Sequence, residues 1–336
     1  MSRVFILLSI VLVSIYQTEQ AYFLTDDYIN QINNEATTWK AGKNFPSNIS
    51  VEYFKSMLGS KGVEKSSNGP LKTEDPNYNN FTIPETFDAR NKWSQCKTIG
   101  HVRDQGMCGS CWALSTTSAF SDRLCIATDG KFNQLISAEK LTFCCYLCGF
   151  GCYGGYPIMA WRYFKYFGIV TGGDYDSNEG CQPYRVEPCV VDDEGHNSCR
   201  GRQIEKRHSC KRQCYGNTTI DYRNDHVYTR NAYHLTAEMI QKDVLAYGPV
   251  EASFLVYDDF LNYKSGVYVK TEHAIYMGGG HSVKLIGWGE EGGVPYWLMV
   301  NSWNSHWGDK GTFKIRRGTN ECGIEDSVTG GVPLTH

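Results

Sequence analysis

The amino-acid sequence predicts an α+β protein with two packed lobes, one helical and one rich in strands. Apolar residues recur in steps of four and three from Ala113 to Ala127, which indicates a helix. Short alternating runs in the last part of the chain, such as Tyr296 to Val300, are typical of strands. Residues 83–336 are near the upper size for one hydrophobic core, so two lobes are favoured.

The N-terminus has the pattern of a secretory signal peptide, which we assign to residues 1–21. Arg3 precedes an apolar run from Val4 to Ile15 that is too short to span a bilayer. No later run has a comparable apolar length, so we expect no contact with a membrane.

The cysteines indicate an oxidising compartment, in agreement with a signal peptide. All 14 lie between Cys96 and Cys322. Asn-x-Ser/Thr sequons, which are candidate glycosylation sites on the same route, begin at Asn48, Asn80 and Asn217. The sequence therefore predicts a protein of the secretory pathway.

Residues 22–82 differ in character from the rest of the chain. Thr25 can cap a helix whose apolar face ends at Trp39, and Ser50 can cap a shorter helix. A cysteine-free linker rich in Gly, Ser, Asn and Pro follows at residues 60–80. The pattern alone leaves two interpretations open: a helical segment on a flexible, cleavable strap, or helices that belong to the main fold.

Cys111 is a candidate nucleophile. It lies in the first turn of the helix predicted from about Ser110 to Asp129, which Gly130 ends. Unpaired N–H groups and the helix dipole stabilise a thiolate there and lower the pKa of the thiol. Two alternatives compete: Cys111 can be a half-cystine, or it can form a redox-active Cys-x-x-Cys pair with Cys108.

A candidate base and its orienting partner occur in the strand-rich region. His281 begins one strand, Asn301 ends the next, and a connection rich in Gly and Glu lies between them. In an antiparallel hairpin centred on residue 291 the two residues face each other, with Cβ atoms roughly 4.5–5.5 Å apart unless a bulge shifts the register. With Cys111 they provide a nucleophile, a base and an orienting group. The alternatives are a hydrogen-bonded structural histidine and an asparagine that merely ends its strand.

Several motifs carry a resemblance to a known family. They are Phe87-Asp88-Ala89-Arg90, Cys108-Gly109-Ser110-Cys111-Trp112, Gly151-Cys152-Tyr153-Gly154-Gly155, Asn301-Ser302-Trp303, Trp307-Gly308 and Cys322-Gly323-Ile324-Glu325. The chain resembles the papain-like cysteine peptidases, and within them the cathepsin B group. The resemblance implies a papain-like two-lobe fold with a central helix in the helical lobe, a β-barrel-like second lobe and an active-site cleft between them. It also implies an inhibitory pro-segment at residues 22–82 and a mature peptidase domain at residues 83–336.

The resemblance assigns roles to the candidate residues. Cys111 is the nucleophile, His281 the base and acid, and Asn301 the residue that orients the imidazole. The side-chain amide of Gln105 joins the Cys111 backbone N–H in an oxyanion hole. Trp303 shelters the bond between His281 and Asn301 from water, although an ordinary core aromatic is the alternative.

The resemblance also implies a substrate-binding site. Gly154 and Gly155 allow a substrate backbone to approach closely, because they have no side chain; an ordinary tight turn is the alternative. Ser327 stands where the family often has an acidic residue, at the bottom of the pocket for the residue two before the cut. We therefore expect a preference for hydrophobic side chains in that pocket.

Six disulfides follow from the resemblance, since the sequence alone does not fix their connectivity. They pair Cys96 with Cys125, Cys108 with Cys152, Cys144 with Cys210, Cys145 with Cys148, Cys181 with Cys214, and Cys189 with Cys199. Cys111 and Cys322 remain free, and the Cys108 bridge would leave Cys111 without a redox partner. No metal site or cofactor is expected, because the cysteines and histidines lack ligand spacing.

The cysteine-rich segment at about residues 181–214 corresponds to the occluding loop of the cathepsin B group. That group has adjacent histidines in this loop, which hold the C-terminal carboxylate of a substrate. Here the sequence reads Val190-Val191-Asp192-Asp193-Glu194, whose acidic groups repel a carboxylate. We therefore predict a mainly endopeptidase activity.

The expected partners are peptide and protein substrates, the chain's own pro-segment and cystatin-type inhibitors. Nucleic acid is excluded, because the net charge is −3 and no Lys/Arg cluster interleaves with aromatics. Nothing in the sequence indicates an oligomer, so we expect a monomer. The predicted location is a lysosome or an extracellular, digestive lumen. The alternative function is that of a catalytically weakened, secreted homologue that binds peptides or proteins.

Overall fold

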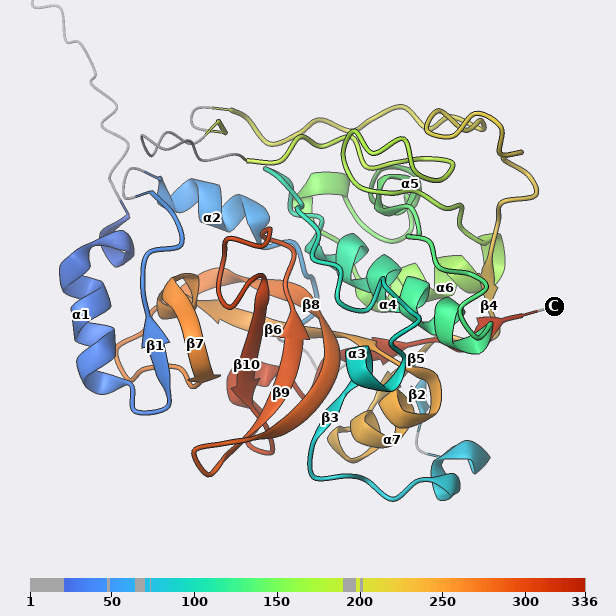
Figure 1. The fold of residues 1–336 in the computed structure, drawn as a ribbon. Helices are drawn as coiled ribbons and strands as arrows, with labels where there is room; N and C mark the ends of the chain where they lie inside the picture. The colour runs from blue at the N-terminus through green and yellow to red at the C-terminus, as the bar shows by residue number, and fades with distance from the viewer. Residues whose placement is uncertain are drawn as a thin grey trace, which may run out of the picture.

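The computed structural model describes residues 21–46, 49–63, 70–72, 74–189, 198–199 and 202–335 (Figure 1). Its α-helices are α1 (Asp26–Glu35), α2 (Val51–Met57), α3 (Ala89–Lys92), α4 (Cys111–Ala127), α5 (Ala138–Cys144), α6 (Pro157–Phe167) and α7 (Ala237–Tyr247). Short 3-10 helices lie at Tyr22–Leu24, Pro76–Asn80, Gly151–Tyr153, Asp258–Asn262 and Glu321–Gly323. None of these helices is long and apolar enough to cross a membrane.

The strands form one large sheet and one small one. They are β1 (Trp39–Ala41), β2 (Leu71–Lys72), β3 (Phe87–Asp88), β4 (Tyr228–Thr229), β5 (Tyr233–Leu235), β6 (Val250–Tyr257), β7 (Tyr263–Tyr268), β8 (Tyr276–Glu291), β9 (Val294–Val300), β10 (Thr312–Arg316), β11 (Val328–Gly330) and β12 (Pro333–Leu334). The large sheet has the order β1-β7-β10-β9-β8-β6-β11-β5-β2, with β3 paired to β8. In the described part of the chain this path does not close into a barrel, so the expected barrel-like lobe is an open sheet.

The central helix α4 begins at Cys111, as the sequence predicts, and it is buried on all sides through Cys125 rather than on one apolar face. Its polar side chains therefore need internal partners. Lys284 of β8 reaches Asp122 of α4 at 2.7 Å, and both side chains are buried. This ion pair joins the helical lobe to the sheet.

The N-terminal segment packs against the strand-rich lobe. Thr25 and Ser50 accept the capping hydrogen bonds that were predicted for α1 and α2. The predicted extent of the first helix is wrong, because Trp39 belongs to β1 and pairs with Gly266 of β7. Apolar residues of this segment, such as Phe54, lie in the same core as the strands. The segment therefore completes the hydrophobic core of that lobe.

The linker at residues 60–80 is not a free strap where the structure describes it. Ser60 pairs with Gly280, and β2 pairs in parallel with β5. The two strands of the N-terminal segment, β1 and β2, thus form the two ends of the large sheet. Backbone pairing at both edges replaces the flexibility expected from the composition.

Candidate active site

Cys111 lies at the N-terminus of α4, completely buried beneath the N-terminal segment. The backbone N–H of Gly59 donates to its Sγ at 3.3 Å. The backbone N–H groups of Ser282 and Trp112 also act on the sulfur and lower its pKa. Burial nevertheless outweighs these groups and raises the pKa of the Cys111 thiol to about 11. The thiolate predicted from the helix dipole is therefore not favoured while Gly59 covers the sulfur.

His281 and Asn301 meet through their side chains. His281 Nε2 lies 2.7 Å from Asn301 Oδ1, which also accepts the backbone N–H of Ser302 at 2.8 Å. The amide oxygen is thus the acceptor for both, and the proton of the neutral imidazole is on Nε2. His281 Nδ1 is left as the basic nitrogen, buried and without a partner among the described residues. Trp303 stacks on the imidazole at 4.5 Å between ring centroids.

The predicted register of the hairpin between β8 and β9 is wrong. Lys284 faces Val300, and a bulge lies between Leu285 and Gly287. The turn is the glycine pair at residues 292–293, both with positive φ, so the hairpin is centred beyond residue 291. In this register His281 and Asn301 are not directly opposite, and β9 ends at Val300 before Asn301.

Gln105 holds a peptide carbonyl of the N-terminal segment. Its Nε2 donates to Met57 O at 2.9 Å and to Cys108 O at 2.7 Å. Its Oε1 accepts from Ser302 Oγ at 2.8 Å, which fixes the orientation of the amide. Ser302 therefore links Asn301, which contacts the imidazole, to Gln105, which contacts the Met57 carbonyl. The sequence did not suggest this role.

Gly155 pairs with the N-terminal segment as it crosses between the lobes. Its N–H donates to Gly59 O at 2.9 Å, and its carbonyl accepts from Lys61 N at 2.9 Å. A Cβ on Gly155 would lie 2.5 Å from the Trp112 ring, and one on Gly154 would lie 2.7 Å from Gly59 O. Both glycines thus permit a close backbone approach.

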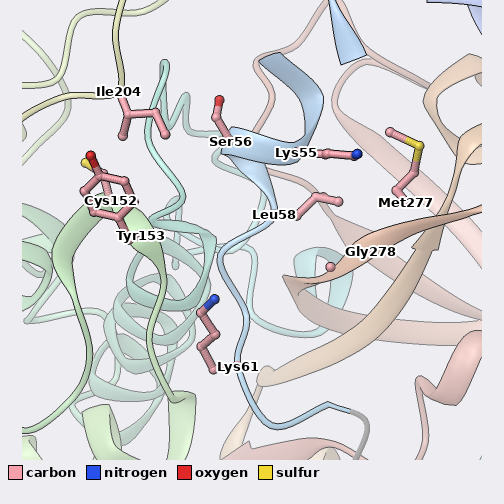
Figure 2. Close-up of a pocket in the computed structure, with 10 residues that line it drawn as sticks. Lys55, Ser56, Leu58, Lys61, Cys152, Tyr153, Ile204, Met277 and Gly278 are labelled. Atoms are coloured by element: carbon pink, nitrogen blue, oxygen red, sulfur yellow. The ribbon is translucent and has the colours of Figure 1, made fainter. Parts of the chain in front are cut away.

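Pockets remain on both sides of this crossing. Figure 2 shows one of about 280 Å³, where Leu58 of the N-terminal segment lies between Tyr153 of one lobe and Gly278 of the other. A second pocket of about 700 Å³ lies between the same segment and Trp303. The segment therefore bridges the cleft between the lobes without filling it.

All six expected disulfides are present, and Cys111 and Cys322 are free. Because Cys108 is bonded to Cys152, Cys111 has no redox partner, which removes the redox-pair interpretation. Three bridges brace the described parts of the cysteine-rich loop, and one of them ties Cys210 to Cys144 outside the loop. Its acidic run at residues 190–194 lies outside the described residues.

Glu251 of β6 is a buried carboxyl group that the sequence analysis missed. Ser253 Oγ donates to its Oε1 at 2.5 Å, and Thr329 Oγ1 donates to its Oε2. Ser253 Oγ also lies 2.8 Å from Ser60 Oγ and 2.8 Å from Ser282 Oγ. Burial raises the pKa of Glu251 to about 7. An acidic residue within the apolar run at 250–256 is the signal that could have found it.

Ser327 and the three asparagines of the sequons are the remaining predicted residues. Ser327 is buried, and its carbonyl accepts the N–H of Ser253 at 2.9 Å. Asn217 is exposed, the side chain of Asn80 is not described, and Asn48 lies outside the described residues, as does the predicted signal peptide except Ala21. No group of three or more metal-ligating side chains occurs in the part of the chain that the structure describes.

Comparison with known proteins identifies two regions of the chain. The papain family cysteine protease profile matches residues 83–332, and the peptidase family C1 propeptide profile matches residues 24–64. Cathepsin B-like cysteine proteinase 4 of Caenorhabditis elegans is 43% identical over 307 residues, which cover 90% of each chain. The cathepsin B-like cysteine proteinase of Schistosoma japonicum is 41% identical over 318 residues, covering 93% of this chain and 92% of the relative.

A solved structure gives the same result. Procathepsin B S9 from Trypanosoma congolense has a TM-score of 0.79 to this structure at 34% identity, covering 94% of this chain and 100% of that one. The segment that crosses the cleft thus lies within the propeptide match, and the thiol, imidazole and amide lie within the protease match. The chain therefore belongs to the papain family of cysteine proteases, as a cathepsin B-like member that carries the family's propeptide.

Proposed function

We propose that this chain is the zymogen of a mainly endopeptidase enzyme in which Cys111, His281, Asn301 and Gln105 perform the chemistry. The observation that carries the proposal is the bond between His281 Nε2 and Asn301 Oδ1, because it leaves Nδ1 as the basic nitrogen. Cys111 lies at the start of α4, within reach of the backbone of Ser282, the neighbour of His281.

In the acylation step, His281 Nδ1 accepts the proton of the Cys111 thiol. The thiolate attacks the peptide carbonyl, and the oxyanion accepts hydrogen bonds from Gln105 Nε2 and the Cys111 N–H. The imidazolium then gives its proton to the leaving amine as the C–N bond breaks. A thioester and a free amine result.

In the deacylation step, neutral His281 removes a proton from water, and the hydroxide attacks the thioester. The C–S bond breaks, the carboxylic acid leaves, and the imidazolium returns its proton to the sulfur. Asn301 accepts from Nε2 throughout, so the ring keeps one orientation. The Met57 carbonyl on Gln105 marks where a substrate carbonyl would bind.

The pro-segment at residues 22–82 blocks this chemistry until it is cut near residues 80–83. Its backbone covers Cys111 through Gly59 and occupies Gly155 and Gln105. Residues 83–336 then form the mature enzyme. We place the protein in the secretory pathway, in a lysosome or a digestive lumen, after removal of residues 1–21, with sugars on Asn48, Asn80 and Asn217. A monomer inhibited by cystatin-type proteins completes this proposal.

The endopeptidase preference rests on the loop sequence at residues 190–194, which has acids in place of a histidine pair. Asp104, which such a histidine would contact, instead accepts from Gly106 N at 2.8 Å and Asn304 Nδ2 at 3.2 Å. A substrate's C-terminal carboxylate would meet repulsion here rather than a donor. Long substrates are accepted, because an internal cut does not require the enzyme to bind the substrate's C-terminal carboxylate.

The test is mass spectrometry of a long peptide with a free carboxylate after digestion by the acid-matured chain in reductant. We expect internal cuts, and stepwise loss of C-terminal dipeptides would refute the endopeptidase preference. Cys111→Ala abolishes cleavage, whereas the matched control Cys322→Ala, which removes the other free cysteine, retains it. No cleavage by a chain whose maturation is verified would favour the alternative, a secreted peptide-binding homologue.

A further inference from the structure

Lys72 is held in a cage of aromatic rings. It lies in the linker, C-terminal to the segment that crosses the cleft. Its Nζ lies 4.9 Å from the ring centroid of Tyr78, 4.3 Å from that of Tyr233 and 4.4 Å from that of Tyr247. The side chain is only 9% exposed. Three ring faces around one ammonium group form a cation–π site of the kind that recognises cationic ligands.

Carboxylates complete the cage. Lys72 Nζ lies 2.8 Å from Asp75 Oδ2 and 3.2 Å from Asp243 Oδ2. Tyr78 donates to the same Asp243 oxygen at 2.8 Å, and Tyr247 donates to Asp75 at 2.7 Å. The ammonium group is thus both neutralised and enclosed.

The backbone of the linker is recognised together with the lysine. Lys72 pairs with Leu235 in a parallel ladder between β2 and β5, and the N–H of His234 donates to Pro70 O at 2.8 Å. Strand addition supplies affinity from the main chain, and the cage supplies selectivity for the side chain. The linker therefore behaves as a bound peptide ligand.

The receiving half of the cage belongs to the mature domain. Tyr233 lies on β5, and Asp243 and Tyr247 lie on α7. Buried Arg123 of α4 pairs with Asp243 and donates to Tyr233 Oη at 2.9 Å. Arg123 thus holds Asp243 and Tyr233 independently of the linker, whereas the hydroxyl of Tyr247 bonds to Asp75 and Asn77 of the linker itself.

This half-cage is remote from the catalytic cleft. β2 ends the large sheet on the side opposite β1, and Figure 1 shows it beside α7 and β5, away from α2. A ligand here would leave Cys111 and Gly155 open to a substrate.

We propose that, in the mature enzyme, Tyr233, Tyr247 and Asp243 form an exosite for a lysine side chain presented by an extended segment of a protein substrate. The ligand adds a strand to the β5 edge that pro-segment removal vacates, and its ammonium group enters the cage. The inference rests on the proposed function only in that maturation must remove the linker.

The probe is a fluorescent nonapeptide with the sequence of residues 70–78, added to acid-matured enzyme whose Cys111 has been alkylated. We expect saturable binding by anisotropy, weakened at least about tenfold when the peptide carries methionine in place of lysine. Tyr247→Leu weakens binding of the lysine peptide to a similar extent. Glu238→Gln, at an exposed position on the same helix, is the matched control and leaves binding unchanged.

Hydrolysis of a dipeptide amide is the second readout, measured before alkylation. Tyr247→Leu leaves this rate unchanged and lowers kcat/KM for a lysine-bearing unfolded protein. Equal binding of the lysine peptide and the methionine peptide overturns the exosite. So does an absence of peptide binding by enzyme that hydrolyses the dipeptide amide. Enzyme that binds the peptide but hydrolyses nothing refutes the proposed function and leaves the exosite standing.

Discussion

His281 Nε2 and Asn301 Oδ1 lie 2.7 Å apart, although their residues are not paired in the ladder between β8 and β9. Asn301 lies just beyond the end of β9, so its side chain is free to turn toward the imidazole. The contact fixes the tautomer of the base and is the feature on which the proposed chemistry depends.

Replacement of Asn301 tests that contact. Asn301→Ala should lower kcat by roughly tenfold to a hundredfold with little change in KM, less than the roughly 10²–10⁴-fold contribution of a general base itself. The ring loses its orientation and Nε2 loses its acceptor. Steady-state kinetics on a peptide amide measure the effect, with exposed Asn224→Ala as the control. An unchanged kcat would refute the orienting role.

Replacement of Gly59 tests how the pro-segment covers the Cys111 thiol. A Cβ at this position would lie 1.8 Å from the carbonyl oxygen of Gly109. Gly59→Ala should therefore force the crossing segment away from Cys111 and expose the thiol in the uncut chain. We expect faster alkylation of the thiol by iodoacetamide at neutral pH than in the unmodified zymogen.

The matched control for this variant is Glu52→Ala, an exposed position on α2 that does not touch the thiol. Its alkylation rate should equal that of the unmodified chain. Equal rates for Gly59→Ala and the unmodified zymogen would show that close approach of this glycine is not what protects the sulfur.

Acid should weaken the hold of the pro-segment through His281. Complete burial lowers the pKa of His281 to about 4 in the zymogen, and release to solvent returns it toward its ordinary value of 6.5. Between these two values the released state binds the proton more strongly, so falling pH favours release by up to about tenfold per pH unit. The inhibition constant of an added pro-segment peptide, measured across this range, should rise as the pH falls.

Above the ordinary pKa of histidine this dependence on His281 should vanish, because the imidazole is neutral in both states. An inhibition constant that does not change between the two pKa values would exclude His281 as the group that couples pH to release.

We expect Glu251 to make the specificity of the pocket proposed at Ser327 depend on pH. With the pro-segment in place, burial raises the pKa of Glu251 to about 7, and departure of the pro-segment should return it toward the ordinary value of a carboxyl group. Glu251 lies behind Ser253, which contacts both Ser60 Oγ and the carbonyl of Ser327. We therefore expect hydrophobic residues to be preferred two positions before the cut in acid, and arginine to gain relative to phenylalanine as the pH rises from acid towards about 7.

The measurement is the ratio of kcat/KM for Arg-Arg and Phe-Arg amides across that range. Glu251→Gln keeps the hydrogen-bonding shape without the charge and should give a ratio that is independent of pH. A ratio in this variant that still rises with pH would assign the effect to another group.

The sequence predicted the site better than it predicted the segment that covers it. Cys111 and the start of α4 follow from helical spacing, which is a local property. The register of β8 and β9 was wrong because the bulge after Leu285 and the turn at residues 292–293 carry no distinct signal among many glycines.

Contacts between distant residues explain the rest. The linker looked flexible from its composition, but Lys72 is ordered by tyrosines more than 150 residues away in the chain. Glu251 was overlooked since its cluster joins distant parts of the sequence: Thr329 donates to Glu251 directly, and Ser60 reaches it only through Ser253. Such clusters depend on the tertiary fold and leave no periodic pattern.

The disulfides are distributed unevenly along the chain. All six join residues between Cys96 and Cys214, whereas the described strands from β4 to β12 contain none. The strand-rich lobe instead shares its core with pro-segment residues such as Phe54. Once the pro-segment is cut away, that lobe has lost part of what it folded around. We therefore expect the mature enzyme to stay folded because it unfolds slowly, and not because it refolds reversibly. Each molecule would then have a finite working life that begins when the pro-segment is removed.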